Sequence, residues 1–166
     1  MKNVFKLFML TLISAAFVVA CSDDDDSGTT PTETEFVATY ADFEGYENWE
    51  LIATNVGTDP ALGTFAHGDT NSTRKIWVNN SDVKMENGEW PVGTILYKQM
   101  NNTETGDLIG HMAMAKRGSD FNPENNGWEW FILDVANGEF TDRGSLAGCN
   151  GCHGGASSDY SFACIK

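Results

Sequence analysis

The sequence is poor in basic residues, and this shortage excludes two classes of partner. Lys and Arg number 10 against 24 Asp and Glu, which gives a formal net charge of -14 at pH 7. Residues 1–20 hold two of the lysines and none of the acids, so their removal lowers the charge to about -16. Nucleic acids and anionic membrane surfaces carry charge of the same sign, and we therefore exclude them as binding partners.

The sequence also lacks an apolar run long enough to cross a bilayer as a helix. Its longest run, Phe5–Val19, follows a basic start and is too short for a membrane span, which predicts a secretory signal over residues 1–20. The signal ends in small residues followed by Cys21, the pattern of a bacterial lipoprotein. We expect Cys21 to be lipidated and to anchor the chain in a membrane, with a plain signal peptide as the alternative.

Residues 21–35 contain almost nothing that can pack into a core. Asp23–Asp26 are four consecutive acids, and Ser, Gly, Thr and Pro follow them, which predicts a solvated tether. An acidic run directly after a lipidated cysteine also resembles a signal for the outer face of the outer membrane. We expect an outer-membrane lipoprotein that faces the periplasm or the cell surface, with residues 36–166 as its one domain.

Periodicity predicts an α+β domain with a predominantly antiparallel sheet. Aromatic residues at helical spacing between Tyr40 and Ile52 predict an amphipathic helix, and Asn80–Asp82 are expected to cap a short helix through Glu86. Short turns join the predicted strands, which favours antiparallel pairing with a few helices at the edges and a C-terminal loop over residues 149–153 after the last long strand. The predicted strands are 74–79, 93–100, 108–117 and 127–135.

The pentad Cys149-Asn150-Gly151-Cys152-His153 is the strongest chemical signal in the chain. Two thiols separated by two residues can each add to a haem vinyl group, and the adjacent His153 can then bind the iron. A zinc site needs two further ligands at similar spacing, and a thioredoxin-like dithiol needs a βαβ context that is not visible here. The pentad therefore predicts one covalently attached haem c, with His153 as its metal ligand.

Period-two alternation assigns the strand side chains to faces of the sheet. Lys98 shares a face with the apolar residues Leu96 and Met100. An isolated ammonium group on an apolar face is costly, so Lys98 must reach solvent, pair with an acid, lose its proton or react. From spacing alone, a lysine that reaches solvent at a sheet edge is the simplest interpretation.

Four residues are candidates for a sixth ligand of the iron. Met112 and Met114 share one face of their strand, His111 belongs to the other face, and His67 lies in a separate segment. Methionine and histidine serve as axial ligands in electron-transfer cytochromes. Methionines in a β core usually fill gaps, however, and an isolated histidine is usually structural.

Cys164 is left over once the lipid and the two thioether bonds are assigned. It is expected either as a buried thiol or as an exposed thiol that forms a disulfide-linked homodimer.

Three segments resemble the cytochrome P-460 family, which includes the β-sheet type of cytochrome c-prime. The first joins Thr73–Asn79 to Gly88–Lys98 and ends in the pattern Gly-Thr-x-x-x-Lys. The second is the tryptophan-containing segment Gly127–Phe131. The third is the pentad, with Ser158–Phe162 downstream of it. Their order and spacing cover most of the domain and make the resemblance specific.

The resemblance implies a five-coordinate, high-spin haem c with His153 as proximal ligand and an open side that binds small nitrogen-oxide ligands. In the family's enzymes, which oxidise hydroxylamine, a lysine is bonded to the haem edge, and Lys98 matches its position. Arg74 matches a family arginine and is expected near the pocket. A carboxylate that accepts protons is expected before the haem motif, where this chain offers Glu139 and Asp142.

Three functions follow as hypotheses. The first is a hydroxylamine oxidoreductase that passes electrons to an acceptor cytochrome. The second is a cytochrome that binds nitric oxide or carbon monoxide without turnover. The third is a simple electron carrier with a six-coordinate, low-spin haem.

Overall fold

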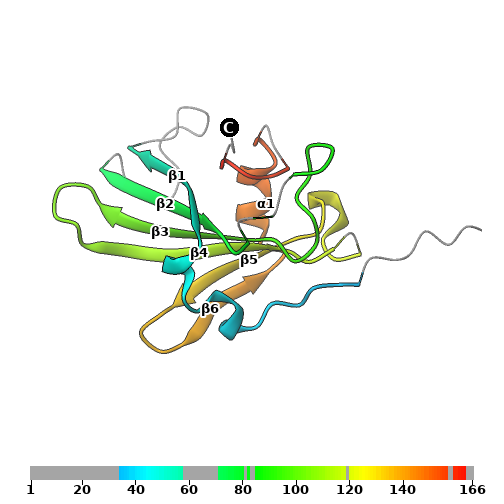
Figure 1. The fold of residues 1–166 in the computed structure, drawn as a ribbon, viewed down its shortest axis with the longest axis horizontal. Coiled ribbons are helices and arrows are strands. Elements are labelled where there is room, and N and C mark those ends of the chain that lie inside the picture. The colour runs from blue at the N-terminus through cyan, green and yellow to red at the C-terminus, as the bar shows by residue number, and fades with distance from the viewer. Residues whose placement is uncertain are drawn as a thin grey trace, which may run out of the picture. The chain divides into compact units, whose positions relative to one another are not determined.

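The chain forms one antiparallel sheet whose strands follow one another in sequence order (Figure 1). The computed structural model describes residues 34–57, 71–80, 82, 85–118, 120–156 and 159–163. The strands of this sheet are β1 (Glu50–Val56), β2 (Ser72–Val78), β3 (Ile95–Asn102), β4 (Leu108–Lys116), β5 (Trp128–Asp134) and β6 (Glu139–Gly144). The helices are η1 (Tyr40–Phe43), η2 (Tyr46–Asn48), η4 (Pro123–Asn125) and α1 (Ala147–His153).

A tight turn joins β3 to β4. Between β3 and β4, the Asn102 side chain accepts the backbone N–H groups of Glu104 and Thr105, and Gly106 has a φ of +77°. Glycine adopts this left-handed conformation without steric cost. All five strand pairs are antiparallel, which confirms the predicted α+β class and its antiparallel sheet.

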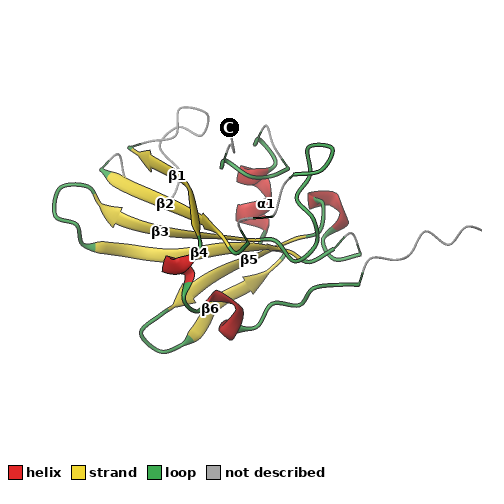
Figure 2. Ribbon diagram, in the orientation of Figure 1, coloured by secondary structure: helices red, strands yellow, loops and turns green. Residues whose placement is uncertain are grey.

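The two faces of the sheet carry two separate hydrophobic clusters, as the alternation predicts. One face buries Tyr97, Ala113 and Phe131 under the segment that contains η1 and η2. The other buries Leu96, Met114 and Trp130 near α1 and the end of the chain. Figure 2 shows these helices on opposite sides of the sheet. The second face is the one that carries the candidate site.

The helix predicted between Tyr40 and Ile52 is wrong. The structure has two 3-10 turns there, separated by Gly45 at a φ of +68°, and then β1. The aromatic residues recur every three positions, which is the period of a 3-10 helix rather than of an α-helix. Phe43 and Tyr46 are buried, so this run of aromatic residues packs into the core.

Three further elements differ from the prediction. The haem motif lies on the helix α1 and not on the predicted loop. The helix was not predicted because Gly148 and Gly151 lower the helix propensity of this segment. Strand β6 was not predicted, since only Phe140 in it is a strong apolar signal. A short helix was expected through Glu86, but Glu86 pairs with Glu89 in an isolated β-bridge. Part of the expected helix lies outside the described residues.

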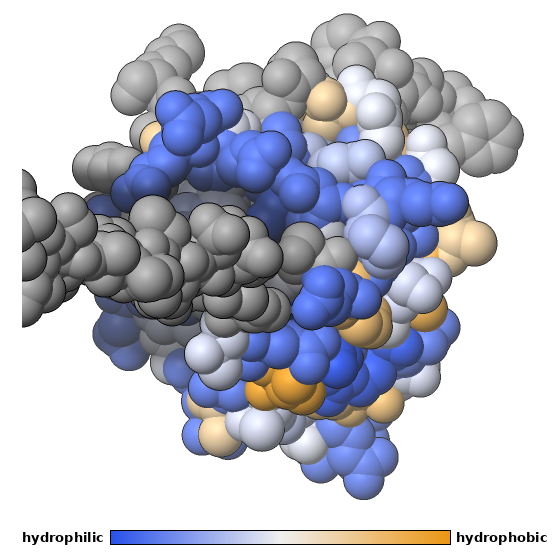
Figure 3. Space-filling model, turned by 90° about the vertical axis from the view of Figure 1, so that its right-hand side faces the viewer, coloured by the Kyte–Doolittle hydropathy of each residue, from blue (hydrophilic) through white to orange (hydrophobic). Residues whose placement is uncertain are grey.

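The face of the molecule seen in Figure 3 is mostly hydrophilic, with isolated apolar residues among the polar ones. This agrees with the acidic composition of the chain. Within the described part of the chain, no helix is both long and apolar enough to cross a membrane. The signal sequence and Cys21 lie outside the described residues.

Candidate haem site

A cavity lies where α1 and the end of the chain meet one face of the sheet. The empty space there is about 860 Å³, a volume that includes open solvent at its mouth. Its walls include Arg74, Ile76, Leu96, Lys98, Met112 and Met114 from the sheet, and Cys149, His153 and Phe162 from the C-terminal part. The fold thus brings the haem motif and the predicted lysine to one place.

His153, the last residue of α1, is held in a single orientation by its neighbours. Its Nδ1 lies 2.7 Å from the backbone oxygen of Tyr160, so Nδ1–H donates to that carbonyl and Nε2 carries the lone pair for a metal. The ring centroid lies 4.5 Å from that of Trp130 and 5.1 Å from that of Phe162. Burial, with the nearby Lys98, lowers the pKa of His153 to about 4, so the imidazole is neutral at pH 7. A neutral, oriented imidazole is what an iron ligand requires.

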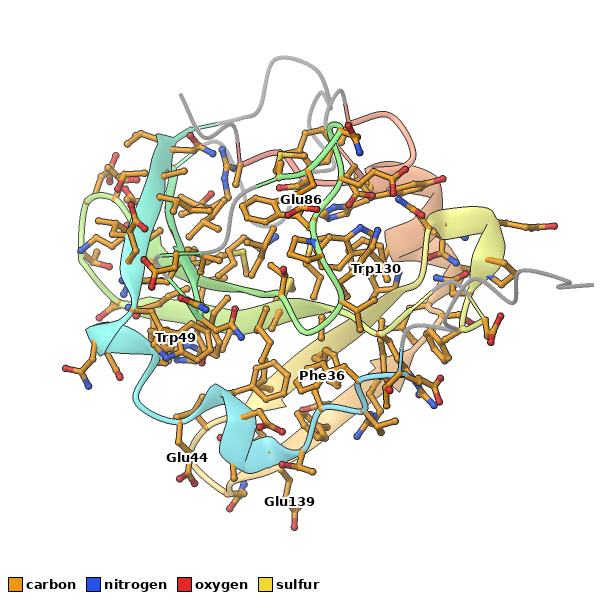
Figure 4. The ribbon with its side chains drawn as sticks, turned by 45° about the vertical axis from the view of Figure 1, so that its right-hand side comes forward. Phe36, Glu44, Trp49, Glu86, Trp130 and Glu139 are labelled. Atoms are coloured by element: carbon orange, nitrogen blue, oxygen red, sulfur yellow. The ribbon has the colours of Figure 1, made fainter. Side chains whose placement is uncertain are left out.

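Cys149 and Cys152 are half-buried and form no disulfide. Three residues apart on a helix, their side chains emerge from the same side of α1. Burial raises the pKa of the Cys149 thiol, and Lys98 opposes that effect. The intervening Asn150 ties the helix to the sheet, because its Oδ1 accepts the Trp130 indole N–H at 2.6 Å. Figure 4 shows Trp130 beside α1, with Trp49 on the other side of the sheet.

Lys98 lies on β3, the third of six strands, and not at a sheet edge. Its cross-strand neighbours are Ile76 and Met112, and all three line the cavity. Burial, assisted by Arg74, lowers the pKa of Lys98 to about 8. A lysine that loses its proton this easily is a better nucleophile than an exposed one. The interpretation of Lys98 as a lysine at a sheet edge is therefore wrong.

Arg74 is buried beside the same cavity. Its Nη1 has no hydrogen-bond partner within the part of the chain that is described. Leaving a buried charged donor unsatisfied is costly, so this guanidinium fits a site whose ligand carries oxygen acceptors or negative charge. Haem has such acceptors in its propionate groups, and the residues around the cavity thus fit that cofactor.

The candidate sixth ligands separate onto different faces of the sheet. Met112 and Met114 line the cavity, as the alternation predicts. His111 lies on the opposite face, where its Nδ1 is 2.9 Å from the Tyr97 hydroxyl. His67 lies outside the described residues, as does Cys164.

The two candidate carboxylates do not line the cavity. Asp142 lies on the edge strand β6 opposite Ile132, and it is exposed. Its charge acts on Cys149, which places it on the side of α1. Glu139 begins β6, is exposed, and points away from the sheet in Figure 4.

Sequence reasoning missed the buried network that supports the proximal side. The carboxylate of Asp159 is fully buried and forms an ion pair with Lys116 at 2.9 Å. It also accepts the Trp90 backbone N–H at 2.8 Å and the Asn126 side-chain amide at 2.7 Å. A buried charge needs such partners, and this one links the segment after α1 to β4 and to two loops.

This network holds a strained stretch of backbone. Asp159 and Tyr160 have φ values of +40° and +57°, in the left-handed region that non-glycine residues adopt at a cost. The strain turns the carbonyl of Tyr160 toward His153 Nδ1. The resemblance of Ser158–Phe162 to the family motif was the available sequence signal, but it did not reveal this role.

Among the described residues, no group of three or more His, Cys, Asp or Glu side chains is placed to hold a metal ion by itself. A search of curated proteins finds no match for this chain. Residues 43–163, well over half of the chain, match the family described as Cytochrome P460. The pentad, the cavity and this match agree, and the chain belongs to the cytochrome P460 family of c-type haem cytochromes.

Proposed function

We propose that this protein is a membrane-anchored cytochrome with one covalently attached haem c that binds and oxidises hydroxylamine or binds nitric oxide. In this proposal Cys149 and Cys152 form the thioether bonds, and His153 is the proximal ligand of the iron. When bound, the haem supplies an iron with one open coordination position for a small nitrogen-oxide ligand.

One observation supports the proposal above the others. The same cavity is lined by Cys149 and His153 of α1 and by Lys98 and Arg74 of the sheet. These are the residues that the haem motif and the family resemblance select independently. A lysine from the centre of a sheet is thereby brought to the haem cavity, as a bond from Lys98 to the haem edge requires.

Each of these residues has a defined task. His153 stays neutral and oriented through its hydrogen bond to the Tyr160 carbonyl. Arg74 presents a buried cation to negative charge in the cavity. Lys98 would hold the haem edge, and Asp142 would take up protons released by hydroxylamine, which requires the carboxylate to reach the ligand through water.

The test compares Lys98→Met with Lys75→Met, a control for an exposed lysine on the neighbouring strand. Digestion and mass spectrometry of the unmodified protein should find the haem peptide joined to the Lys98 segment. Lys98→Met should lose this joined peptide and hydroxylamine-dependent reduction of an electron acceptor, whereas Lys75→Met should keep both. A clean, unmodified Lys98 peptide from active protein would contradict the cross-link.

A second function, the binding of nitric oxide or carbon monoxide without turnover, is favoured by one observation. Within the described residues, the cavity walls include no carboxylate that could accept protons from hydroxylamine. This alternative predicts rapid binding of both gases and no reduction of an acceptor when hydroxylamine is added. The two functions are thus separated by one steady-state assay.

The cellular setting is part of the proposal. Lipidation of Cys21 anchors the protein as a bacterial outer-membrane lipoprotein that faces the periplasm or the cell surface. An acceptor cytochrome removes the electrons, and an exposed Cys164 would be able to form a disulfide-linked homodimer. Metabolic labelling with a fatty acid tests the anchor, because Cys21→Ser should abolish the label.

A further inference from the structure

On the face of the sheet opposite the haem cavity, a set of oxidisable aromatic rings is packed together. Tyr97 stacks on Tyr46 with ring centroids 3.8 Å apart and an interplanar angle of 14°. Tyr46 in turn meets the edge of Trp77 at 5.1 Å, and Trp49 lies 6.2 Å from Tyr97. Tyr97 is 1% exposed, so its ring is screened from solvent. Packing of this kind leaves each ring in van der Waals contact with another.

Tyr97 has a built-in proton acceptor. Its hydroxyl lies 2.9 Å from Nδ1 of His111, within the range of a direct proton transfer. Burial lowers the pKa of His111, which keeps the imidazole neutral and able to accept a proton. Burial also raises the pKa of Tyr97 above its ordinary range, so the ring cannot lose an electron by first becoming a phenolate.

Tyr97 is also the chain neighbour of Lys98. Successive residues of a strand point to opposite faces, so Lys98 reaches into the haem cavity while Tyr97 packs on the other side. Only one layer of backbone separates the two. Phe131 belongs to the cluster around Tyr97 and also borders the haem cavity, which makes the packing between the two sites continuous.

We propose that Tyr97 and His111 form a proton-coupled redox pair that gives one electron to the haem centre when peroxide oxidises it. Hydrogen peroxide takes two electrons, one from the iron and one from the Tyr97 ring, and with two protons from solvent it becomes two molecules of water. The O–H bond of Tyr97 breaks and an N–H bond forms at Nδ1 of His111. The products on the protein are a neutral tyrosyl radical and an imidazolium ion.

The surface beside the pair provides a way to restore it. Tyr97 and Tyr46 both border a surface hollow that Glu44 and Glu47 also line. A soluble one-electron donor that reaches this hollow reduces the radical, and the proton returns from His111 to the Tyr97 oxygen. The pair thus draws oxidising equivalents away from the cavity, where Met112 and Met114 are open to oxidation. This activity requires bound haem but not hydroxylamine turnover.

The experiment is electron paramagnetic resonance of the full-length, haem-loaded protein, frozen shortly after peroxide is added. The expected signal is an organic radical that narrows when the protein is made with ring-deuterated tyrosine. Tyr97→Phe should reduce it at least tenfold, and His111→Gln, which keeps a hydrogen-bonding side chain but removes the base, should slow its appearance. Tyr40→Phe is the matched control, because Tyr40 borders the same hollow without the histidine, and it should keep the full signal.

An unchanged tyrosyl signal in Tyr97→Phe, or no tyrosyl signal in the unmodified protein, would overturn the proposal. If Tyr97→Phe does not load haem, electron–nuclear double resonance on the unmodified protein gives the decision. An exchangeable proton hydrogen-bonded to the radical oxygen is the result expected from the His111 imidazolium, and a radical without one contradicts the pair. A protein that does not oxidise hydroxylamine can still give the tyrosyl radical signal. The proposed hydroxylamine oxidation and the proposed Tyr97–His111 pair can therefore be refuted independently of each other.

Discussion

Replacement of Asp159 by asparagine should destabilise the protein severely. Asparagine has nearly the same shape and tolerates the left-handed backbone that residue 159 adopts, so the substitution changes charge and hydrogen bonding more than conformation. The buried ammonium of Lys116 loses its counter-charge at 2.9 Å. The amide group of asparagine must also face at least one N–H donor that the carboxylate accepted, such as Trp90 N or Asn126 Nδ2.

The expected loss is about 3–5 kcal/mol in the free energy of unfolding, the usual cost of removing one partner of a buried ion pair. Urea denaturation followed by tryptophan fluorescence measures it. Asp82→Asn, which changes an exposed carboxylate in a turn, should leave the curve unchanged. A second variant, Asp159→Asn with Lys116→Met, should recover at least about 1 kcal/mol, because the charge left unpaired is also removed.

The same variant should alter the proximal ligand. Asp159 holds the strained segment that presents the Tyr160 carbonyl to His153, so a relaxed segment weakens this hydrogen bond. The iron–histidine stretching frequency of the reduced protein should fall, because the imidazole becomes a weaker donor. A loss of stability below about 1 kcal/mol, with an unchanged stretching frequency, would refute the argument that Asp159 sustains this geometry.

Three further predictions concern the two faces of the sheet. Burial raises the pKa of Tyr97, and that of Tyr46 to about 12, so above about pH 10 the folded state retains protons that the unfolded state loses. The free energy of unfolding should therefore fall as the pH rises above about 10. Denaturation curves at several pH values should show a smaller fall for the double variant Tyr46→Phe with Tyr97→Phe. Arg74→Leu should weaken azide binding to the ferric protein about 10- to 150-fold, because a charged hydrogen bond of about 1.5–3 kcal/mol is lost for the anion. Carbon monoxide binding to the ferrous protein should be unchanged, and titrations followed by absorbance measure both affinities. Phe43→Ala should lower the free energy of unfolding by about 3–5 kcal/mol, because Phe43 is 2% exposed and its ring centroid lies 4.9 Å from that of Phe131. Val37→Ala, at a position that is 49% exposed, should lower it much less, and urea denaturation measures both.

The sequence pattern predicts the sheet and the faces of its central strands well, because alternation has only two outcomes for each strand. That rule places Lys98, Met112 and Met114 on one face and Tyr97 and His111 on the other, and the structure confirms it. The haem attachment site could likewise be predicted, because its two cysteines and its histidine lie within five adjacent residues. The residues that surround the cavity come from five strands and from the C-terminal part, and the family resemblance was needed to link Lys98 and Arg74 to the haem in advance.

The features that the sequence did not reveal depend on long-range contacts or on competing local signals. Asp159 meets Lys116, Trp90 and Asn126 across 33 or more positions of the chain, and no local pattern shows which acid will be buried. The aromatic residues before β1 recur every three positions, and this spacing was interpreted as an amphipathic α-helix. Two glycines lower the helix propensity of α1, so its sequence did not indicate a helix. In each case tertiary packing decided between conformations that the local sequence leaves nearly equal in free energy.

The covalent attachment of haem at the pentad is tested most directly by mass spectrometry of the digested, purified protein. The structure predicts that haem is recovered on the peptide that contains Cys149 and Cys152, bonded through both sulfurs. It also predicts that His153→Ala leaves this attachment in place and changes only the absorption spectrum of the iron. Recovery of the peptide with two free thiols from protein matured with a c-type haem attachment system would contradict the assignment of the site.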